Sequence, residues 1–182
     1  MYDRSCYLFE RRLEMLEIEG GCAGRPGLAT LDRSDGEPLS RMFGRLSPES
    51  VYRRFFSPIS RPDVFQASVL RIDHHDHEAI AAVEGGEIVG VAQYARPPGA
   101  KQADLAIIVA DAWQRQGLGT RLIAALTNRA ADEGVDAFKV DIQGDNYGAL
   151  RLLKRVGPGV RLRFSAGVGE GSIPITSDHT HG

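Results

Sequence analysis

The chain has 182 residues, of which 42% are hydrophobic and 25% charged, with a formal net charge of −2. This balance is typical of one globular domain, and the charge gives no electrostatic footprint for nucleic acid or for an anionic membrane. No apolar run approaches the roughly 20 residues that span a bilayer, the N-terminus lacks a signal-peptide core, and two cysteines are too few for a disulfide framework. We therefore expect a cytoplasmic protein with free thiols.

Residues 1–26 are predicted to form an N-terminal appendage. Leu8, Leu13 and Leu16 could line one face of a helix that ends at Gly20. Two interpretations stay open for it. One is a surface helix packed on the domain, and the other is an arm that binds a partner or joins two copies into a homodimer.

The next segment is predicted to hold a short strand followed by three helices. Apolar residues at helical spacing predict the first helix over residues 34–46, where Ser34 and Glu37 would form a capping box. Ser47 is placed to cap the second helix, with Pro48 at its first position. The strand is predicted over residues 27–31, the second helix from Pro48 to before Pro58, and the third over residues 62–70.

A β-hairpin comes next, with Gly85 and Gly86 free to take positive φ in its turn. The later elements are predicted from apolar runs and turn residues. They are hairpin strands over residues 79–83 and 88–94, a central strand over 105–109, a helix ending at Gly134, a strand over 137–142, a helix from Asp145 or Asn146 to Val156, and a strand over 160–165. This order predicts an α/β fold with a mixed, mostly antiparallel sheet flanked by helices. We assign residues 27–165 to one domain and residues 166–182 to a tail, in which residues 173–175 could add an edge strand.

The central strand leads into a glycine-bearing turn and then a helix. This layout aims free backbone N–H groups and the positive end of a helix dipole at one point, which suits a phosphate group. Gly117 and Gly119 carry no Cβ, so a ligand can approach the backbone closely. The P-loop pattern does not match, because it needs Lys followed by Ser or Thr after its last glycine, and Thr120 and Arg121 stand there. The dinucleotide fingerprint does not match either, because Leu122 stands in place of its third glycine.

Gln114, Gly117 and Gly119 match in register the motif Gln/Arg-x-x-Gly-x-Gly/Ala of the GNAT superfamily of acyl-CoA-dependent N-acetyltransferases. The element order over residues 27–165 also resembles that family. The resemblance implies the GNAT fold, acetyl-CoA as cosubstrate, and an enzyme that acetylates a primary amine. The cofactor-binding residues that it implies are Ile108, Val109, Gln114, Arg115, Gln116, Gly117, Leu118, Gly119, Thr120 and Asn146.

Within this superfamily the chain is similar to the acetyltransferase domain of bacterial protein-lysine acetyltransferases. The similarity is carried by residues 42–50, residues 53–56, Ile72 with Asp73, and residues 103–106 running on to Trp113 and Gln114. Some of those enzymes carry an extra acyl-CoA-synthetase-like or cyclic-nucleotide-binding module, and we expect neither here. The resemblance implies a protein lysine as acceptor. The alternatives are a small-molecule amine and a non-catalytic acetyl-CoA-binding regulatory subunit.

Acetyl transfer to a lysine amine calls for a general base, because only about one such amine in a thousand is neutral near pH 7.4. Asp104 stands where the resembling enzymes place a catalytic glutamate, and it is our candidate. Its side chain is one methylene shorter than that of glutamate, so we expect a bridging water to extend its reach. Weaker candidates are Glu78, Asp73 and Asp141. The resemblance also implies a backbone oxyanion donor among residues 108–110, at a bulge that splays the central strand from the next one.

Leu153 departs from the family pattern, because many GNAT enzymes carry a tyrosine there as the acid for the leaving thiolate. Solvent could protonate the thiolate, whose ordinary pKa is about 8.5. Tyr94 on the neighbouring strand is an alternative donor. The departure also leaves room for a regulatory subunit without catalysis.

Two polar groups have weaker functional interpretations. The run His-His-Asp-His at residues 74–77 lacks a distant partner that would complete a zinc site, so we expect no metal there. Arg53, Arg54 and Arg61 flank the expected acceptor cleft and could recognise acidic residues near a target lysine. The alternative for these arginines is a solvated helix face.

Overall fold

The computed structural model describes residues 25–57 and 62–175. Its strands are β1 (Gly27–Thr30), β2 (His77–Glu84), β3 (Glu87–Ala95), β4 (Gln102–Val109), β5 (Ala137–Gln143), β6 (Arg163–Ser165) and β7 (Val168–Pro174). Its helices are α2 (Gly36–Gly44), α3 (Pro48–Phe55), α4 (Pro62–Val69), α5 (Leu118–Asp132) and α6 (Tyr147–Val156), with a 3-10 turn η1 (Asp111–Trp113). None of these helices is long and apolar enough to span a bilayer. The predicted appendage lies, up to residue 24, outside the described residues.

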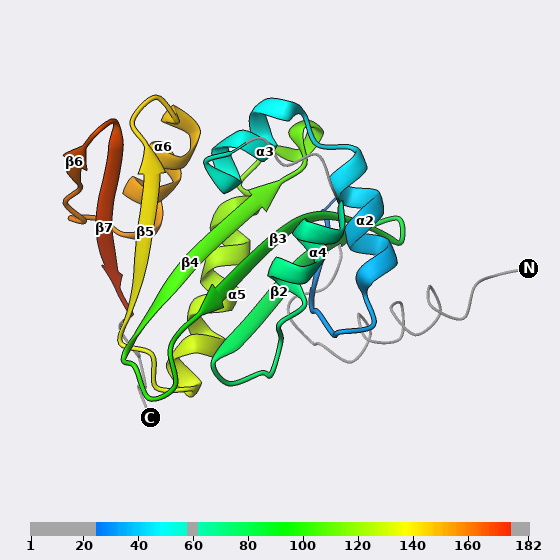
Figure 1. Ribbon diagram of the computed structural model, residues 1–182, viewed down its shortest axis with the longest axis horizontal. Helices are drawn as coiled ribbons and strands as arrows, with labels where there is room; N and C mark the ends of the chain where they lie inside the picture. The colour runs from blue at the N-terminus through cyan, green and yellow to red at the C-terminus, as the bar shows by residue number, and fades with distance from the viewer. Residues whose placement is uncertain (1–24, 58–61, 176–182) are drawn as a thin grey trace, which may run out of the picture.

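The strands form a seven-stranded sheet in the order β1-β2-β3-β4-β5-β7-β6 (Figure 1). Neighbouring strands are antiparallel, except that β4 and β5 run parallel. Helices cover both faces of this sheet, with α2 and α4 on one face and α5 on the other. The predicted α/β fold with a mixed, mostly antiparallel sheet is confirmed.

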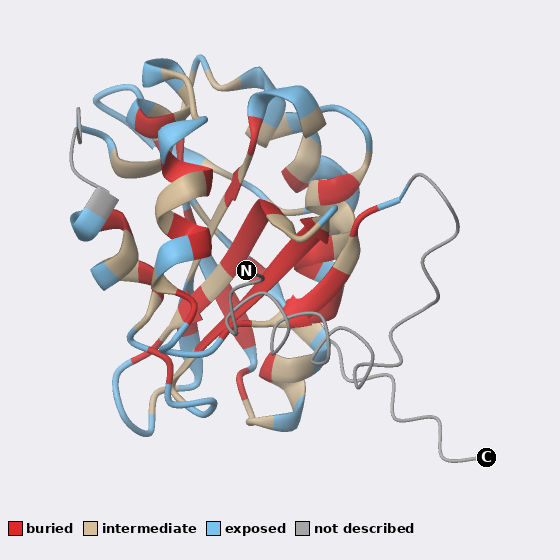
Figure 2. Ribbon diagram, turned by 90° about the vertical axis from the view of Figure 1, so that its right-hand side faces the viewer, coloured by how far each residue is buried: buried red, intermediate tan, exposed pale blue. Residues whose placement is uncertain are grey.

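Each face of the central strands buries its own hydrophobic core, as the red strands in Figure 2 show. Alternation of side chains along β2 sends Ile80 into the core under α5 and Ala81 into the core under α2 and α4. Leu122 of α5 and Leu39 of α2 are among the fully buried helix residues that meet these faces. Because β2 and β3 are buried on both sides, they form a rigid base for β4.

One of the two predicted helix caps is present, at α3, and the other, at α2, is absent. The Ser47 hydroxyl caps α3 as predicted, accepting the Ser50 N–H at 3.2 Å. The predicted Ser34–Glu37 capping box is wrong, because α2 starts after Asp35 and has no side-chain cap. The Ser34 N–H instead donates to the Asp32 carboxylate at 3.0 Å, so Ser34 belongs to the preceding turn.

The C-terminal part of the sheet differs from the predicted edge strand. β7 is longer than residues 173–175 and lies between β5 and β6, so it is an inner strand. Its Ile173 pairs with Phe138 of β5, and both side chains are buried. The burial of Ile173 favours this inner position, and the sheet continues past residue 165.

The pairing of β4 with β5 is short, and it shapes the rest of the molecule. It covers only three residue pairs and ends at Asp104 with Lys139. β4 stays paired with β3 up to Val109 without a register shift, and β5 stays paired with β7 up to Gln143. The two strands therefore diverge toward α3 and α6, as Figure 1 shows, and they do so without the bulge in β4 that the resemblance implied.

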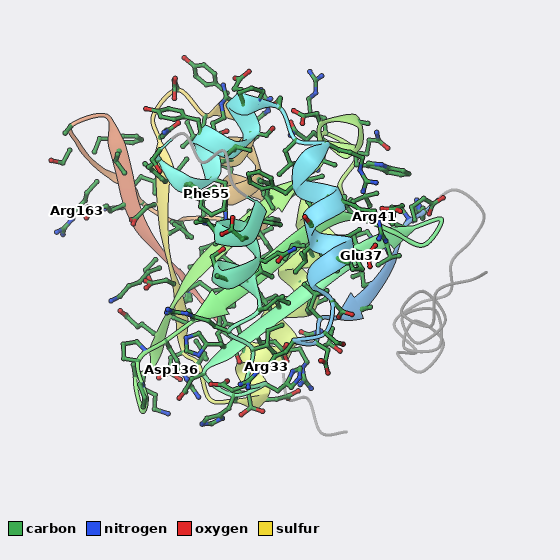
Figure 3. All side chains as sticks on the ribbon, turned by 45° about the vertical axis from the view of Figure 1, so that its right-hand side comes forward. Arg33, Glu37, Arg41, Phe55, Asp136 and Arg163 are labelled. Carbon is green, nitrogen blue, oxygen red and sulfur yellow. The ribbon has the colours of Figure 1, made fainter. Side chains whose placement is uncertain are left out.

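The packing of α3 and α4 predicts a large cost for Phe65→Ala. Phe65 is fully buried, with its ring centroid 5.5 Å from that of Phe43 and its ring edge-on to that of Phe55. Phe55 lies on α3, where Figure 3 labels it. We expect the free energy of unfolding, measured by urea denaturation, to fall by about 3–5 kcal/mol. The control Val64→Ala removes an exposed neighbour and should change it by less than about 0.5 kcal/mol. Similar small losses for both variants would contradict this packing role.

Candidate active site

Two adjoining pockets lie where β4 and β5 diverge. The strand pocket, of about 430 Å³, lies between β4, β5, α3 and α6 and includes Asp104 in its lining. The turn pocket, of about 470 Å³, lies at the β4–α5 turn and is closed by α3 and α6. The residues that line both pockets, and so mark their junction, are Arg53, Arg54, Ile107, Asn146, Ala149 and Leu152.

The turn pocket has the backbone of an anion site. The turn takes left-handed conformations at Arg115 (φ 60°) and Gly117 (φ 81°). The first helical hydrogen bond of α5 runs from the Arg121 N–H to the Gly117 carbonyl at 3.2 Å. The N–H groups of the first three residues of α5 therefore have no acceptor within the helix. Together with the helix dipole, they favour a phosphate group in this pocket.

Most of the predicted cofactor-binding residues line the turn pocket. They are Ile108, Val109, Gln114, Arg115, Gly117, Gly119, Thr120 and Asn146. Gln116 and Leu118 are not among its lining residues: the Gln116 amide donates to the Ala112 carbonyl at 2.8 Å, and Leu118 is buried in the core under α5. Asn146 also caps α6, because its side chain accepts the Ala149 N–H at 3.1 Å.

Two arginines that the sequence interpretation missed also line the turn pocket. Arg151 and Arg155 lie four residues apart on α6 and so share one helix face. With Arg115 they surround the turn with positive charge. Helical spacing from the Asn146 cap is the sequence signal that could have identified them.

A polar cluster ties α3 to the turn. The Asp111 carboxylate accepts hydrogen bonds from the hydroxyls of Ser47 at 2.7 Å and Ser50 at 2.8 Å, and from the Ser47 N–H at 3.0 Å. The Gln114 amide donates to the Ser50 hydroxyl at 3.1 Å and to the Val109 carbonyl at 3.0 Å. The glutamine of the motif thus braces the turn against α3 and the end of β4.

The hydrogen-bond ladder between β3 and β4 indicates which N–H groups of β4 face the gap between β4 and β5. The Ala110 N–H donates to the Val89 carbonyl of β3 at 2.9 Å, so it is not available to a ligand. Bonded and non-bonded pairs alternate along an antiparallel ladder, which directs the Ile108 N–H toward β3 as well. The N–H groups of Ile107 and Val109 point away from β3. Of the three residues predicted to supply an oxyanion donor, Val109 is the one whose N–H points toward the gap between β4 and β5.

Asp104 lies exposed at the start of β4 and lines the strand pocket. In the sheet register it lies beside Lys139 of β5, so the two side chains point to the same face of the sheet. Asp141, two residues along β5, also lines this pocket. Within the described residues Asp104 forms no hydrogen bond or ion pair. Its carboxylate is therefore accessible to a ligand in the pocket.

Neither of the other two predicted bases lines the strand pocket or the turn pocket. Glu78 is buried on the α5 side, where it contacts His74 at 3.2 Å and accepts a hydrogen bond from Arg129 at 3.1 Å. Asp73 accepts three backbone N–H groups of its own loop. Both carboxylates are held in structural interactions away from the gap, so the prediction that either could act as the base is wrong.

The prediction that Tyr94 could donate a proton to the thiolate is also wrong. It is almost fully buried, and its hydroxyl donates to the His75 carbonyl at 2.9 Å. Burial, followed by the nearby charges of Glu78 and Glu133, raises the pKa of Tyr94 to about 12. Leu153 lines the strand pocket as expected, and no tyrosine of residues 25–57 or 62–175 lines either pocket.

The histidine loop makes ordinary polar contacts. His75 contacts Glu133 of α5, and His77 contacts the Asp73 carboxylate at 3.3 Å. Across residues 25–57 and 62–175, no group of three or more histidine, cysteine, aspartate or glutamate side chains is arranged to hold a metal ion.

Comparison with known proteins identifies the family. A model of the acetyltransferase (GNAT) family matches residues 46–157, which include β4, the turn, α5 and α6. The chain belongs to this family. It is also 30% identical over 125 residues to acetyltransferase Pat of Mycolicibacterium smegmatis, a match that covers 67% of this chain and 37% of that protein. The chain thus spans little more than a third of that relative's length.

Two solved structures share the fold. The GNAT domain of S. lividans PAT superposes with a TM-score of 0.74 at 23% identity, covering 82% of this chain and 90% of that one. The yncA protein of Salmonella typhimurium, solved with its cofactor acetyl-CoA, superposes with a TM-score of 0.65 at 16% identity, covering 87% of this GNAT chain and 98% of that one.

The polar cluster predicts pH-dependent stability. Partial burial alone would raise the pKa of Asp111, but the hydrogen bonds from Ser47 and Ser50 outweigh it and lower that pKa. Since the folded-state pKa is depressed, the stabilisation is present above the unfolded pKa near 3.9 and is lost as pH falls through the folded value.

We therefore expect Asp111→Asn to lower the free energy of unfolding by about 1 kcal/mol at pH 7, because the group is largely exposed and solvent screens it. The loss should shrink at pH 3. Urea denaturation at both pH values measures this, with Asp132→Asn at an exposed site on α5 as the control. Equal losses at both pH values would contradict the assignment.

Proposed function

We propose that this chain transfers an acetyl group from acetyl-CoA to a primary amine, and that the acceptor is a protein lysine. The observation that carries the proposal is the junction of the turn pocket with the strand pocket where β4 leaves β5. The turn pocket offers N–H groups and arginines for the phosphates of CoA. The strand pocket offers a free carboxylate for the amine. The junction brings the thioester and the amine together.

In this proposal each part of acetyl-CoA binds to a different element. The pyrophosphate binds the N–H groups at the start of α5, with Arg115, Arg151 and Arg155 supplying opposite charge. The pantetheine arm lies along the free edge of β4, where the backbone of Ile107 and Val109 has no strand partner. This places the thioester at the pocket junction.

In the chemical step the amine nitrogen attacks the thioester carbonyl carbon. The new C–N bond forms and the C–S bond breaks, so CoA leaves as the thiolate. Asp104, directly or through a water, takes the proton from the amine. The Val109 N–H stabilises the charge that develops on the carbonyl oxygen. The thiolate takes a proton from solvent, because Leu153 cannot donate one.

The likeness to acetyltransferase Pat supports a protein lysine over a small amine as acceptor. A second candidate function is a non-catalytic acetyl-CoA-binding subunit. It is favoured because no tyrosine in the described part of the chain lines either pocket. A thiol-release assay with acetyl-CoA and a panel of proteins and small amines separates these functions. Acetyl-lysine detected by mass spectrometry supports the first, and CoA binding without turnover supports the second.

The assigned base predicts the effect of Asp104→Asn. We expect kcat to fall by about 10²- to 10⁴-fold, because the amide cannot take the amine proton. The dissociation constant for CoA, measured by calorimetry, should stay within about threefold, since the carboxylate is not in the turn pocket. Asp141→Asn serves as the comparison, with less than a tenfold effect on kcat. A wild-type kcat in Asp104→Asn would exclude this residue as the base.

The turn predicts the effect of Gly117→Glu on cofactor binding. A carboxylate at Gly117 would repel the phosphates in the turn pocket, so CoA affinity should fall at least about 100-fold. Gly99→Glu is a matched control: both glycines have positive φ (81° and 75°), both have open space at the Cβ position, and Gly99 lines neither pocket. The control should bind CoA within about threefold of the wild type. Unchanged binding in Gly117→Glu would mean that the phosphate site lies elsewhere.

A further inference from the structure

Arg54 is a partly desolvated cation at the junction of the two pockets. Its guanidinium lies over the ring of Phe55, with Cζ 4.7 Å from the ring centroid. Burial lowers the pKa of Arg54 to about 10. In the part of the chain that the structure describes, Arg54 has no hydrogen bond or ion pair, whereas the adjacent Arg53 pairs with Glu49. Both arginines line the two pockets, but only the charge of Arg53 is partly neutralised by a carboxylate.

A charge that loses water without gaining a counter-charge is costly, and an anion that binds beside it recovers part of that cost. A single aromatic contact replaces part of the lost hydration but leaves the N–H donors of the guanidinium available. The site is therefore built to receive an anionic group from a ligand.

The position of Arg54 favours a carboxylate over a CoA phosphate. The phosphate groups are already served by the N-terminus of α5 and by Arg115, Arg151 and Arg155, none of which lines the strand pocket. Arg54, like Ile107, lines both pockets, and the proposed function places the thioester at their junction. The anion that reaches it comes with the acyl group or with the acceptor.

We propose that Arg54 binds a carboxylate at the junction of the two pockets, an inference that rests on the proposed function. The planar guanidinium can hold a carboxylate through two N–H donors. Two sources share this chemistry: the far carboxylate of a dicarboxylic acyl group such as succinyl, and an acidic side chain next to the acceptor lysine. With a succinyl donor the amine nitrogen bonds to the acyl carbon, the C–S bond breaks, CoA leaves as the thiolate, Asp104 takes the proton, and the far carboxylate is unchanged.

The first arm of the test measures acyl donors. Calorimetry compares succinyl-CoA with acetyl-CoA on the wild type, Arg54→Gln, Arg54→Lys and Arg53→Gln. If the carboxylate comes with the acyl group, the wild type binds succinyl-CoA about 10- to 100-fold tighter than Arg54→Gln does, while acetyl-CoA affinity differs by less than threefold. Arg54→Lys should keep part of the preference because it keeps the charge.

The second arm measures acceptors. It compares kcat/KM with acetyl-CoA for lysine peptides that carry Glu or Gln beside the lysine. If the carboxylate comes with the acceptor, the wild type prefers the Glu peptide about tenfold and Arg54→Gln loses that preference. Arg53→Gln removes the same charge from the same helix and from the same two pockets. Because the Arg53 guanidinium is paired with Glu49, this variant should keep the preference ratio in both arms, whatever its effect on kcat/KM itself.

Three outcomes would overturn the inference. Arg54→Gln could weaken acetyl-CoA and succinyl-CoA equally, which would make Arg54 a phosphate ligand. The wild type could bind acetyl-CoA normally yet show no carboxylate preference in either arm. Arg54→Gln could also lower the ligand-free Tm by several degrees, which would indicate a structural role. If the wild type binds no CoA ester at all, the proposed function fails instead.

Discussion

The molecule is organised by the separation of β4 from β5. Their pairing stops after Asp104 and Lys139, and a strand edge inside a folded domain then lacks a partner. Unpaired backbone groups in a partly buried place cost free energy unless something bonds to them. A ligand with its own amide groups, such as the pantetheine arm of CoA, can occupy that edge as a strand would. The two pockets and their junction follow from this one interruption of the sheet.

Three separate sets of contacts keep the gap open. β3 holds β4 along its whole length, and β7 holds β5 on its far side, so neither strand can close the gap without losing a ladder. The third set is the cluster of Asp111, Ser47 and Ser50, which holds α3 over the turn. This explains why α3, remote in sequence from the phosphate turn, contributes to the lining of both pockets.

The sequence could predict what depends on neighbouring residues. The strand, turn and helix around Gly117, the Ser47 cap and the element order all depend on local patterns. The sequence could not predict the partner strand of Ile173 or the direction of the Val109 N–H, because both depend on sheet register. Contacts between residues about 60 apart, such as that of Asp111 with Ser47, leave no local pattern. The partial burial of Arg54 against Phe55 also depends on how α3 packs, so the sequence could not predict it.

The most direct test of this account is amide hydrogen exchange with and without acetyl-CoA. We predict that the ligand slows exchange at least tenfold at Ile107 and Val109 on the free edge of β4 and at residues 118–120. Amides of β2 and β3, each of which pairs with a strand on both sides, should not change. Protection at the turn alone, with β4 unaffected, would contradict the claim that the gap between β4 and β5 is the site where the acyl donor lies.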